Sequence, residues 1–340
     1  MNVMGLDLLS TEGTDLGIEP LLARSGTIVR AYREQDSGCV SFVVEQASQR
    51  LFVKAVLTPA GAESLARAEA LHAAVRHPAL PQLLNAFSCA DGPVHVYTWV
   101  PGEVLYDYVT MDGARGRAEP SSAHARFRAL PISRIVDSLG VIYDLHALIA
   151  QKGFVAVDFY DGCILYDFVD HRTWVCDLDK YRPGPFVLAA DRLPGSRRFM
   201  APEESVRGAT IDQRTNVFTL GRAAAILLGD GDLEFDAWRG NDAMHAALRE
   251  ATMPEPDARY ASVALFVEAW ADAVSDSRRI LSATFEANPT NAESGNADPV
   301  LQSGQQSRND QDDRQVDRRD DEVHLEGVRR VESDLLSGQR

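Results

Sequence analysis

The strongest constraint on the fold is a change of hydrophobic pattern near residue 100. Before this point, short segments rich in β-branched and aromatic residues alternate with turns of Gly, Ser, Asp and Gln, a pattern that predicts strands. One helical stretch, ESLARAEALHAAV, interrupts them and ends at His77 and Pro78. The five predicted strands are TIVRAYRE, CVSFVVEQ, RLFVKAVL, LLNAF and VHVYTWV. The first hundred residues are therefore expected to form a sheet with one helix.

From residue 131 onwards the apolar residues follow the helical period of 3.6 instead. A long helix is expected to begin there and to end at Lys152 and Gly153. The segments DQRTNVFTLGRAAAILL and SVALFVEAWADAV predict two more helices, whereas residues 112–130 are typical of a surface loop with solvated arginines. Strands followed by helices indicate an α+β fold, with a sheet-rich first lobe and a helical second lobe joined near residues 100–103.

The composition changes again from Glu286. The last 55 residues contain 13 acidic residues, 7 arginines and no aromatic residue. Such a segment buries too little apolar surface to offset the entropy lost on ordering. A short amphipathic helix at VHLEGVRRVESDLL is the less favoured alternative. We expect an N-terminal extension at residues 1–24, the first lobe at 25–99, the hinge and second lobe at 100–280, and a disordered acidic tail at 281–340.

Charge and cysteine usage exclude several classes of protein. The formal net charge of −16 argues against nucleic acid or an anionic membrane as the main partner. The four cysteines form no CxxC pair, which argues against a disulfide framework or a zinc site. The first residues lack a basic signal-peptide region, and no apolar run is long enough to span a bilayer. We expect a cytoplasmic protein.

Three segments carry residues suited to phosphate and metal chemistry. Only three of the 34 basic residues are lysines, and one of them, Lys54, lies on the third predicted strand, from which a lysine can bind phosphate. Asp158 follows an apolar run in a polar turn, a position suited to a general base. Asp177 and Asp179 follow a buried strand and offer oxygen ligands for Mg²⁺. Taken alone, Lys54 is more typical of a solvated side chain, and Asp177 and Asp179 are more typical of an Asp-rich turn.

In their order along the chain, these segments resemble the protein kinase family, in particular bacterial Ser/Thr protein-kinase-like domains with a divergent catalytic loop. The resemblance covers about residues 27–275. LFVKAV resembles the VAIK strand, GFVAVDFYDGCILYD the catalytic loop, CDLD the DFG segment and RTNVFTLGRAA the helix F motif. GSRRFMAPEE, the most specific match, is close to the end of an activation segment. The resemblance implies a two-lobed kinase-like fold with a small β-rich N-lobe and a larger helical C-lobe.

The resemblance also implies a set of site residues, with ATP and Mg²⁺ (or Mn²⁺) as cofactors and a protein Ser or Thr hydroxyl as acceptor. Lys54 would bind phosphates, Asp177 would bind the metal, and Asp158 would accept the proton of the substrate hydroxyl. Gly38 would be the remaining glycine of the phosphate-binding loop, and Glu69 the helix acid that pairs with the lysine. The last expected contact is an ion pair that anchors the activation segment, between Glu203 and Arg259.

The departures from the family pattern bear on catalysis. The HRD triplet is replaced by Ala156, Val157 and Asp158, and the metal-binding asparagine falls on Cys163, whose thiol is a poor ligand for Mg²⁺. Asp161 and Asp179 are candidates to replace that asparagine. A pseudokinase that senses nucleotide or acts as a scaffold is therefore the alternative function. A third alternative is a small-molecule kinase of the aminoglycoside phosphotransferase type, and GSRRFMAPEE argues against it.

Overall fold

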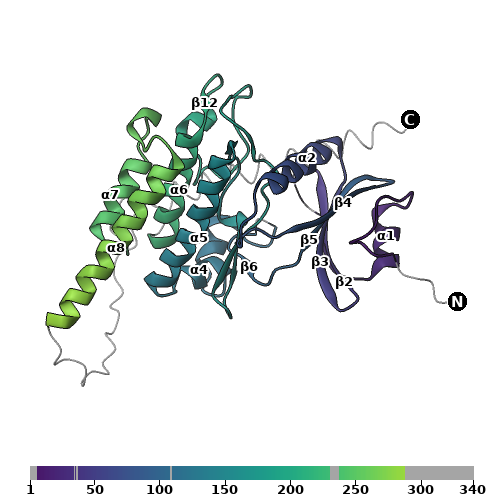
Figure 1. The fold of residues 1–340 in the computed structure, drawn as a ribbon, viewed down its shortest axis with the longest axis horizontal. Coiled ribbons are helices and arrows are strands. Elements are labelled where there is room, and N and C mark those ends of the chain that lie inside the picture. The colour runs from purple at the N-terminus through teal and green to yellow at the C-terminus, as the bar shows by residue number, and fades with distance from the viewer. Residues whose placement is uncertain (1–5, 34, 36, 108, 230–236, 288–340) are drawn as a thin grey trace.

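The structure is a computed structural model that describes residues 6–33, 35, 37–107, 109–229 and 237–287, with the backbone alone for residues 276–287. The sheet lies in the N-terminal part of the chain and the helices gather in the C-terminal part, as Figure 1 shows. We call residues 6–98 the sheet region and residues 99–287 the helical region. The chain is thus of mixed α and β structure, with the two kinds of element largely segregated.

All five expected strands are present and form one antiparallel sheet of order β1-β2-β3-β5-β4. Side chains alternate between its two faces. Val53 and Ala55 of β3 point into an apolar cluster on one face, so Lys54 between them points to the other. The helix α2 (Pro59–Ala74) packs with β3, β4 and β5. The strands are β1 (Thr27–Tyr32), β2 (Cys39–Gln46), β3 (Gln49–Val56), β4 (Leu83–Cys89) and β5 (Gly92–Thr98).

The apolar face of the sheet is covered by the segment that the sequence assigned to a separate extension. Helix α1 (Ile18–Ser25) buries Leu21 and Leu22 against that face, and Leu8 packs beside them. The Gln46 side chain accepts a hydrogen bond from the Leu8 amide and donates to the Leu6 and Ser25 carbonyls. The expected extension is therefore not separate from the first lobe, because residues 6–25 form a layer of the sheet region itself.

Four long helices build the helical region. They share one core in which Tyr143 packs edge-on against Phe266 and Trp270 at centroid distances of 5.1 and 5.4 Å. The Tyr143 hydroxyl donates a hydrogen bond to the Leu220 carbonyl, which satisfies its one polar group inside this core. The helices are α5 (Ile132–Gln151), α6 (Gln213–Leu228), α7 (Asp242–Ala251) and α8 (Val263–Ala287).

Short elements and the loops between them follow the sheet region, and they contain Asp158, Asp161, Asp177, Asp179 and Glu203. The hairpin of β8 and β9 pairs with β6, while β7 pairs with β10 and β11 with β12. The strands are β6 (Glu103–Val104), β7 (Phe154–Val155), β8 (Ile164–Asp167), β9 (Arg172–Val175), β10 (Arg182–Pro183), β11 (Phe186–Val187) and β12 (Thr210–Ile211). The short helices are α3 (Gly113–Ala118), α4 (Ala123–Arg128), η1 (Asp161–Cys163), η2 (Pro202–Ser205) and η4 (Pro256–Ala258).

Two further expectations need correction. Residues 112–130 form α3 and α4 rather than a loop, and Arg117 is buried rather than solvated. Helix α8 continues to Ala287, so residues 281–287 belong to a helix and not to the tail. The rest of the expected tail lies outside the described residues. None of the helices in the described part of the chain is both long and apolar enough to cross a lipid bilayer.

Candidate active site

Lys54 of β3 binds two carboxylates that follow β9. Its Nζ donates to Asp177 Oδ1 at 2.7 Å and to Asp179 Oδ2 at 2.8 Å. The Lys54 and Asp179 side chains are 8% and 4% exposed, whereas Asp177 is 48% exposed. Burial alone would lower the pKa of Lys54, but the two carboxylates outweigh it and raise that pKa well above its usual value. The lysine is thus a buried, charged group that joins the sheet region to the helical region.

Helix α2 contacts the segment of Asp179 through a basic side chain, that of Arg67, rather than through an acidic one. Arg67 Nε donates to the main-chain carbonyl of Asp179 at 2.9 Å, and its Nη2 donates to the Ser64 hydroxyl. Glu69, the expected partner of Lys54, is 59% exposed and lies 3.6 Å from Nε2 of His95. The described ion pairs of Lys54 involve Asp177 and Asp179 alone. The role expected for Glu69 is therefore wrong, because its side chain faces the histidine instead.

Asp158 sits in a strained turn that neighbouring segments support. It has a positive φ of 66°, uncommon for a residue with a side chain. Just before it, the Asn216 side chain accepts a hydrogen bond from the Ala156 amide and donates to the Ala156 carbonyl. Gly195 lies against Asp158, since a Cβ at Gly195 would be 3.5 Å from Asp158 Oδ1. The turn thus holds Asp158 beside the segment that leads to Glu203.

Cys163 lies beside Asp158 and the segment that leads to Asp177. Its thiol is buried and contacts the Asp158 carbonyl at 3.3 Å, and its own carbonyl accepts from the Cys176 amide. Burial raises the pKa of this thiol well above its usual value, and the charges of Asp177 and Asp158 raise it further. A neutral thiol is a poor partner for a hard cation. In the described residues, no three His, Cys, Asp or Glu side chains form a group that could hold a metal ion.

Asp161 belongs to a buried cluster of bases and is not available to a metal. Its Oδ2 accepts from Arg117 Nε at 3.1 Å and from Arg198 Nη1 at 2.9 Å, and His124 Nε2 lies 3.6 Å away. Burial opposes the charge of this carboxylate, but Arg198 and Arg117 prevail and lower its pKa. Burial also lowers the pKa of His124 to about 4, so this imidazole is neutral at pH 7. The cluster ties α3 and α4 to the catalytic-loop candidate and to residue 198.

Gly38 occupies a close contact with the start of α2. Its φ is +74°, and a Cβ there would lie 2.3 Å from the Thr58 hydroxyl oxygen. Its carbonyl accepts from the amides of Leu57 and Thr58. A glycine is therefore required at this position by packing and backbone geometry. The structure accounts for Gly38 without a ligand, so its expected role in phosphate binding stays a prediction.

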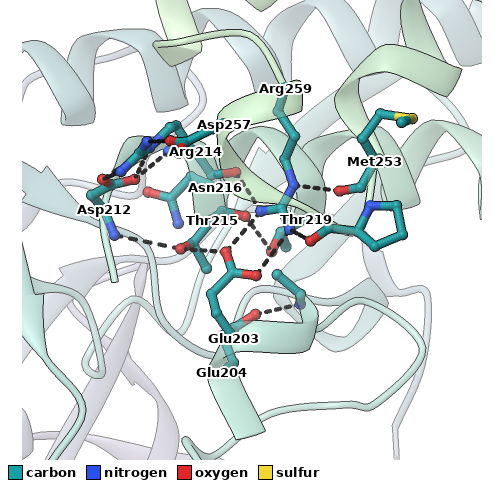
Figure 2. Close-up of polar contacts among 12 residues, drawn as sticks. Glu203, Glu204, Asp212, Arg214, Thr215, Asn216, Thr219, Met253, Asp257 and Arg259 are labelled. Carbon is teal, nitrogen blue, oxygen red and sulfur yellow. Dashed lines mark hydrogen bonds and ion pairs between the residues drawn. The ribbon is translucent and has the colours of Figure 1, made fainter. Parts of the chain in front are cut away.

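The ion pair expected between Glu203 and Arg259 is present and is the centre of the network in Figure 2. Arg259 donates to both Glu203 oxygens, at 2.7 and 2.9 Å. Its remaining hydrogen bonds go to the carbonyls of Met253, Arg214 and Pro254, so that all three guanidinium nitrogens are bound. The Arg259 side chain is fully buried and that of Glu203 is 9% exposed. Two distant parts of the helical region are thereby fixed together.

Sequence reasoning missed the supporting residues. Asn216 lies within RTNVFTLGRAA, where its amide was the available signal. Arg117, His124 and Arg198 carried no such signal, because nothing in the sequence places them beside Asp161. His146 was predicted only as part of the long helix. Its Nε2 lies 2.8 Å from the Tyr181 hydroxyl oxygen, and its ring packs on Phe159 next to Asp158.

A cavity of about 500 Å³ lies at the end of α2, and none of the candidate residues above lines it. Its walls come from α2, the connection to β4, the end of β5 and β9: His72, Val75, Arg76, His77, Pro78, Leu80, Pro81, Gln82, Thr98, Val100 and Trp174. Comparisons with known proteins add no assignment to this site or to the cavity. No protein-family model matches the chain, and no curated protein matches it significantly.

Proposed function

We propose that this chain is a protein-kinase-like phosphotransferase, which transfers a phosphoryl group from ATP to a Ser or Thr hydroxyl of a protein. The carrying observation is the direct contact between Lys54 of the sheet region and Asp177 of the helical region, 123 positions apart. A phosphate-binding lysine and a metal-binding carboxylate would need this proximity, because both would act on the phosphates of one nucleotide. The segregated sheet and helices support a kinase-like two-lobed fold.

The residues present fit this reaction in part. Asp177 is half exposed and offers hard oxygen ligands, so it fits Mg²⁺ or Mn²⁺. Such an ion would neutralise the charge that develops on the transferred phosphoryl group. Lys54 is positively charged and fits a phosphate oxygen. Asp158 is partly exposed and would accept the proton of the attacking hydroxyl. Cys163 and Asp161 do not fit a second metal.

A pseudokinase that binds nucleotide without transfer is the second candidate. It is favoured by Cys163, whose buried neutral thiol lies beside Asp158 and Asp177 and supplies no oxygen ligand. The fold and Lys54 serve this function equally well, since phosphate binding needs only the charge. The two candidates differ in whether phosphate leaves the nucleotide.

Purified protein incubated with γ-labelled ATP, Mg²⁺ or Mn²⁺ and a generic protein acceptor tests the proposal. We expect slow label transfer that is abolished in Asp158→Ala. The matched control is Asp170→Ala, which removes an exposed aspartate from the turn between β8 and β9. Nucleotide binding without transfer, equal in both variants, would support the pseudokinase. An absence of nucleotide binding would overturn the phosphotransferase and the nucleotide-binding pseudokinase, and would leave a scaffold as the alternative function.

A further inference from the structure

The two aspartates bound to Lys54 lie at nearly the same distance from it but differ in exposure to solvent. Asp179 is 4% exposed and Asp177 is 48% exposed, although both oxygens lie within 2.8 Å of Nζ. A charge pair inside the protein is weakly screened, whereas a half-exposed carboxylate exchanges its partner for water or ions at little cost. Lys54 therefore has one buried partner and one half-exposed partner.

The main chain of Asp179 is also held from outside its own segment. Arg67 of α2 donates its Nε to the Asp179 carbonyl, and Ser64 accepts from both Arg67 Nη2 and Lys180 Nζ, the latter at 3.5 Å. Helix α2 thus fixes Asp179 through its backbone and leaves the Asp179 side chain to Lys54.

We propose that Asp179 is the positioning residue for Lys54, and that it holds the ammonium group in place when Asp177 turns to a divalent cation. This inference rests on the proposed function, because it assigns the two acids of the site different tasks during nucleotide binding. It replaces the expectation that Asp179 is a metal ligand. It also means that Lys54 is fixed without an acid from α2.

The inference predicts different nucleotide binding by three matched acid-to-amide variants. Asp179→Asn should weaken ATP binding at least about tenfold, both in EDTA and in Mg²⁺, because the lysine loses its fixed partner. Its adenosine affinity should stay within about twofold of the wild-type value. Asp177→Asn should keep ATP affinity in EDTA and lose the gain caused by Mg²⁺. Glu69→Gln, the control on α2, should change neither affinity.

A second measurement tests the anchoring without any nucleotide. With three lysines in the chain, 13C labelling at the lysine ε carbon gives three assignable signals. An immobilised ammonium group leaves the two ε protons inequivalent, whereas a mobile lysine averages them. We expect inequivalent protons for Lys54 in the wild type and Asp177→Asn, and averaged protons in Asp179→Asn. If the wild type binds no ATP, the proposed function fails while this measurement still decides the anchoring.

Two results would overturn the inference. The first is a loss in Asp179→Asn of only the Mg²⁺-dependent part of ATP binding, which would make Asp179 a metal ligand. The second is averaging of the Lys54 signal in Asp177→Asn with none in Asp179→Asn. If Asp179→Asn does not fold, as judged by circular dichroism, Asp179→Glu and Asp177→Glu replace the pair. Asp179→Glu should then lower ATP affinity in EDTA, and Asp177→Glu should not.

Discussion

Glu203 and Glu204 are neighbours in sequence, yet their carboxyl groups meet opposite environments. Glu203 is bound by the Arg259 guanidinium, while Glu204 is buried and accepts a hydrogen bond from the Ala201 amide at 2.6 Å. Burial raises the pKa of Glu204 to about 8; the Ala201 hydrogen bond opposes this shift, and the Glu203 charge adds to it. The Arg259 and Arg192 charges lower this pKa but do not compensate. Glu204 is therefore protonated near pH 7 in the folded protein.

This difference predicts how stability depends on pH. The folded state binds a proton at Glu204 that the unfolded state releases above about pH 4.5, so the contribution of Glu204 to stability falls between about pH 4.5 and 8. Glu204→Gln should remove this loss, at most about 1.4 kcal/mol per pH unit, and should make the protein more stable than wild type at pH 8.5. Urea unfolding of both proteins at pH 5.5, 7 and 8.5 measures it. If the free energy of unfolding of the two proteins changes with pH in the same way, Glu204 is not protonated in the folded state at pH 7.

Cys163 gives a prediction about metal binding at the same scale. An asparagine in its place would add an amide oxygen near Asp158, where the thiol now contacts the Asp158 carbonyl. We expect Cys163→Asn to lower the Mg²⁺ concentration needed for half-maximal ATP binding. Cys163→Ser, which removes the thiol and adds no such reach, is the control. The same half-maximal Mg²⁺ concentration for wild type and both variants would show that residue 163 does not contribute to metal binding.

At the scale of elements, the Arg259 network joins η2 to the segment between α7 and α8. Truncation of Arg259 would leave the Glu203 carboxylate buried without its charge partner. Arg259→Met should therefore destabilise the protein by about 3–5 kcal/mol. Glu203→Gln combined with Arg259→Met should cost less than the sum of the single variants, because both remove the same pair. Chemical denaturation of the four proteins measures this coupling, and strict additivity would contradict it.

Regular elements were predicted from the sequence more successfully than the contacts between segments. The segment CVSFVVEQ was predicted as a strand from its β-branched and aromatic residues, and it forms β2 from Cys39 to Gln46 with its first six residues buried. The Glu203–Arg259 pair was also expected, because the resemblance to protein kinases implies an ion pair between these two segments of the chain. Asp161 was misread because its burial depends on Arg117 and Arg198, which lie 44 and 37 positions away. Glu69 was misread because Asp179, on a distant loop, takes the lysine that a helix acid was expected to bind.

At the scale of the whole molecule, we expect the layer formed by residues 6–25 to contribute to the stability of the fold. Leu21 is fully buried between α1 and the sheet, so Leu21→Ala should destabilise the protein by about 2–5 kcal/mol. Leu9→Ala, which shortens an exposed leucine of the same layer, should change stability by less than about 0.5 kcal/mol. Urea unfolding measures both. Equal effects would show that α1 does not contribute to the core.

The layer also sets an order of events during synthesis. Residues 6–25 leave the ribosome before any strand of the sheet, and an eight-residue helix is too short to be stable in water by itself. The surface that receives Leu21 and Leu22 includes Val94 and Val96 of β5, which lies between β3 and β4 in the sheet. Residues 6–25 therefore find their partners only after about residue 98 has emerged, and until then a nascent chain exposes apolar residues that a chaperone can bind.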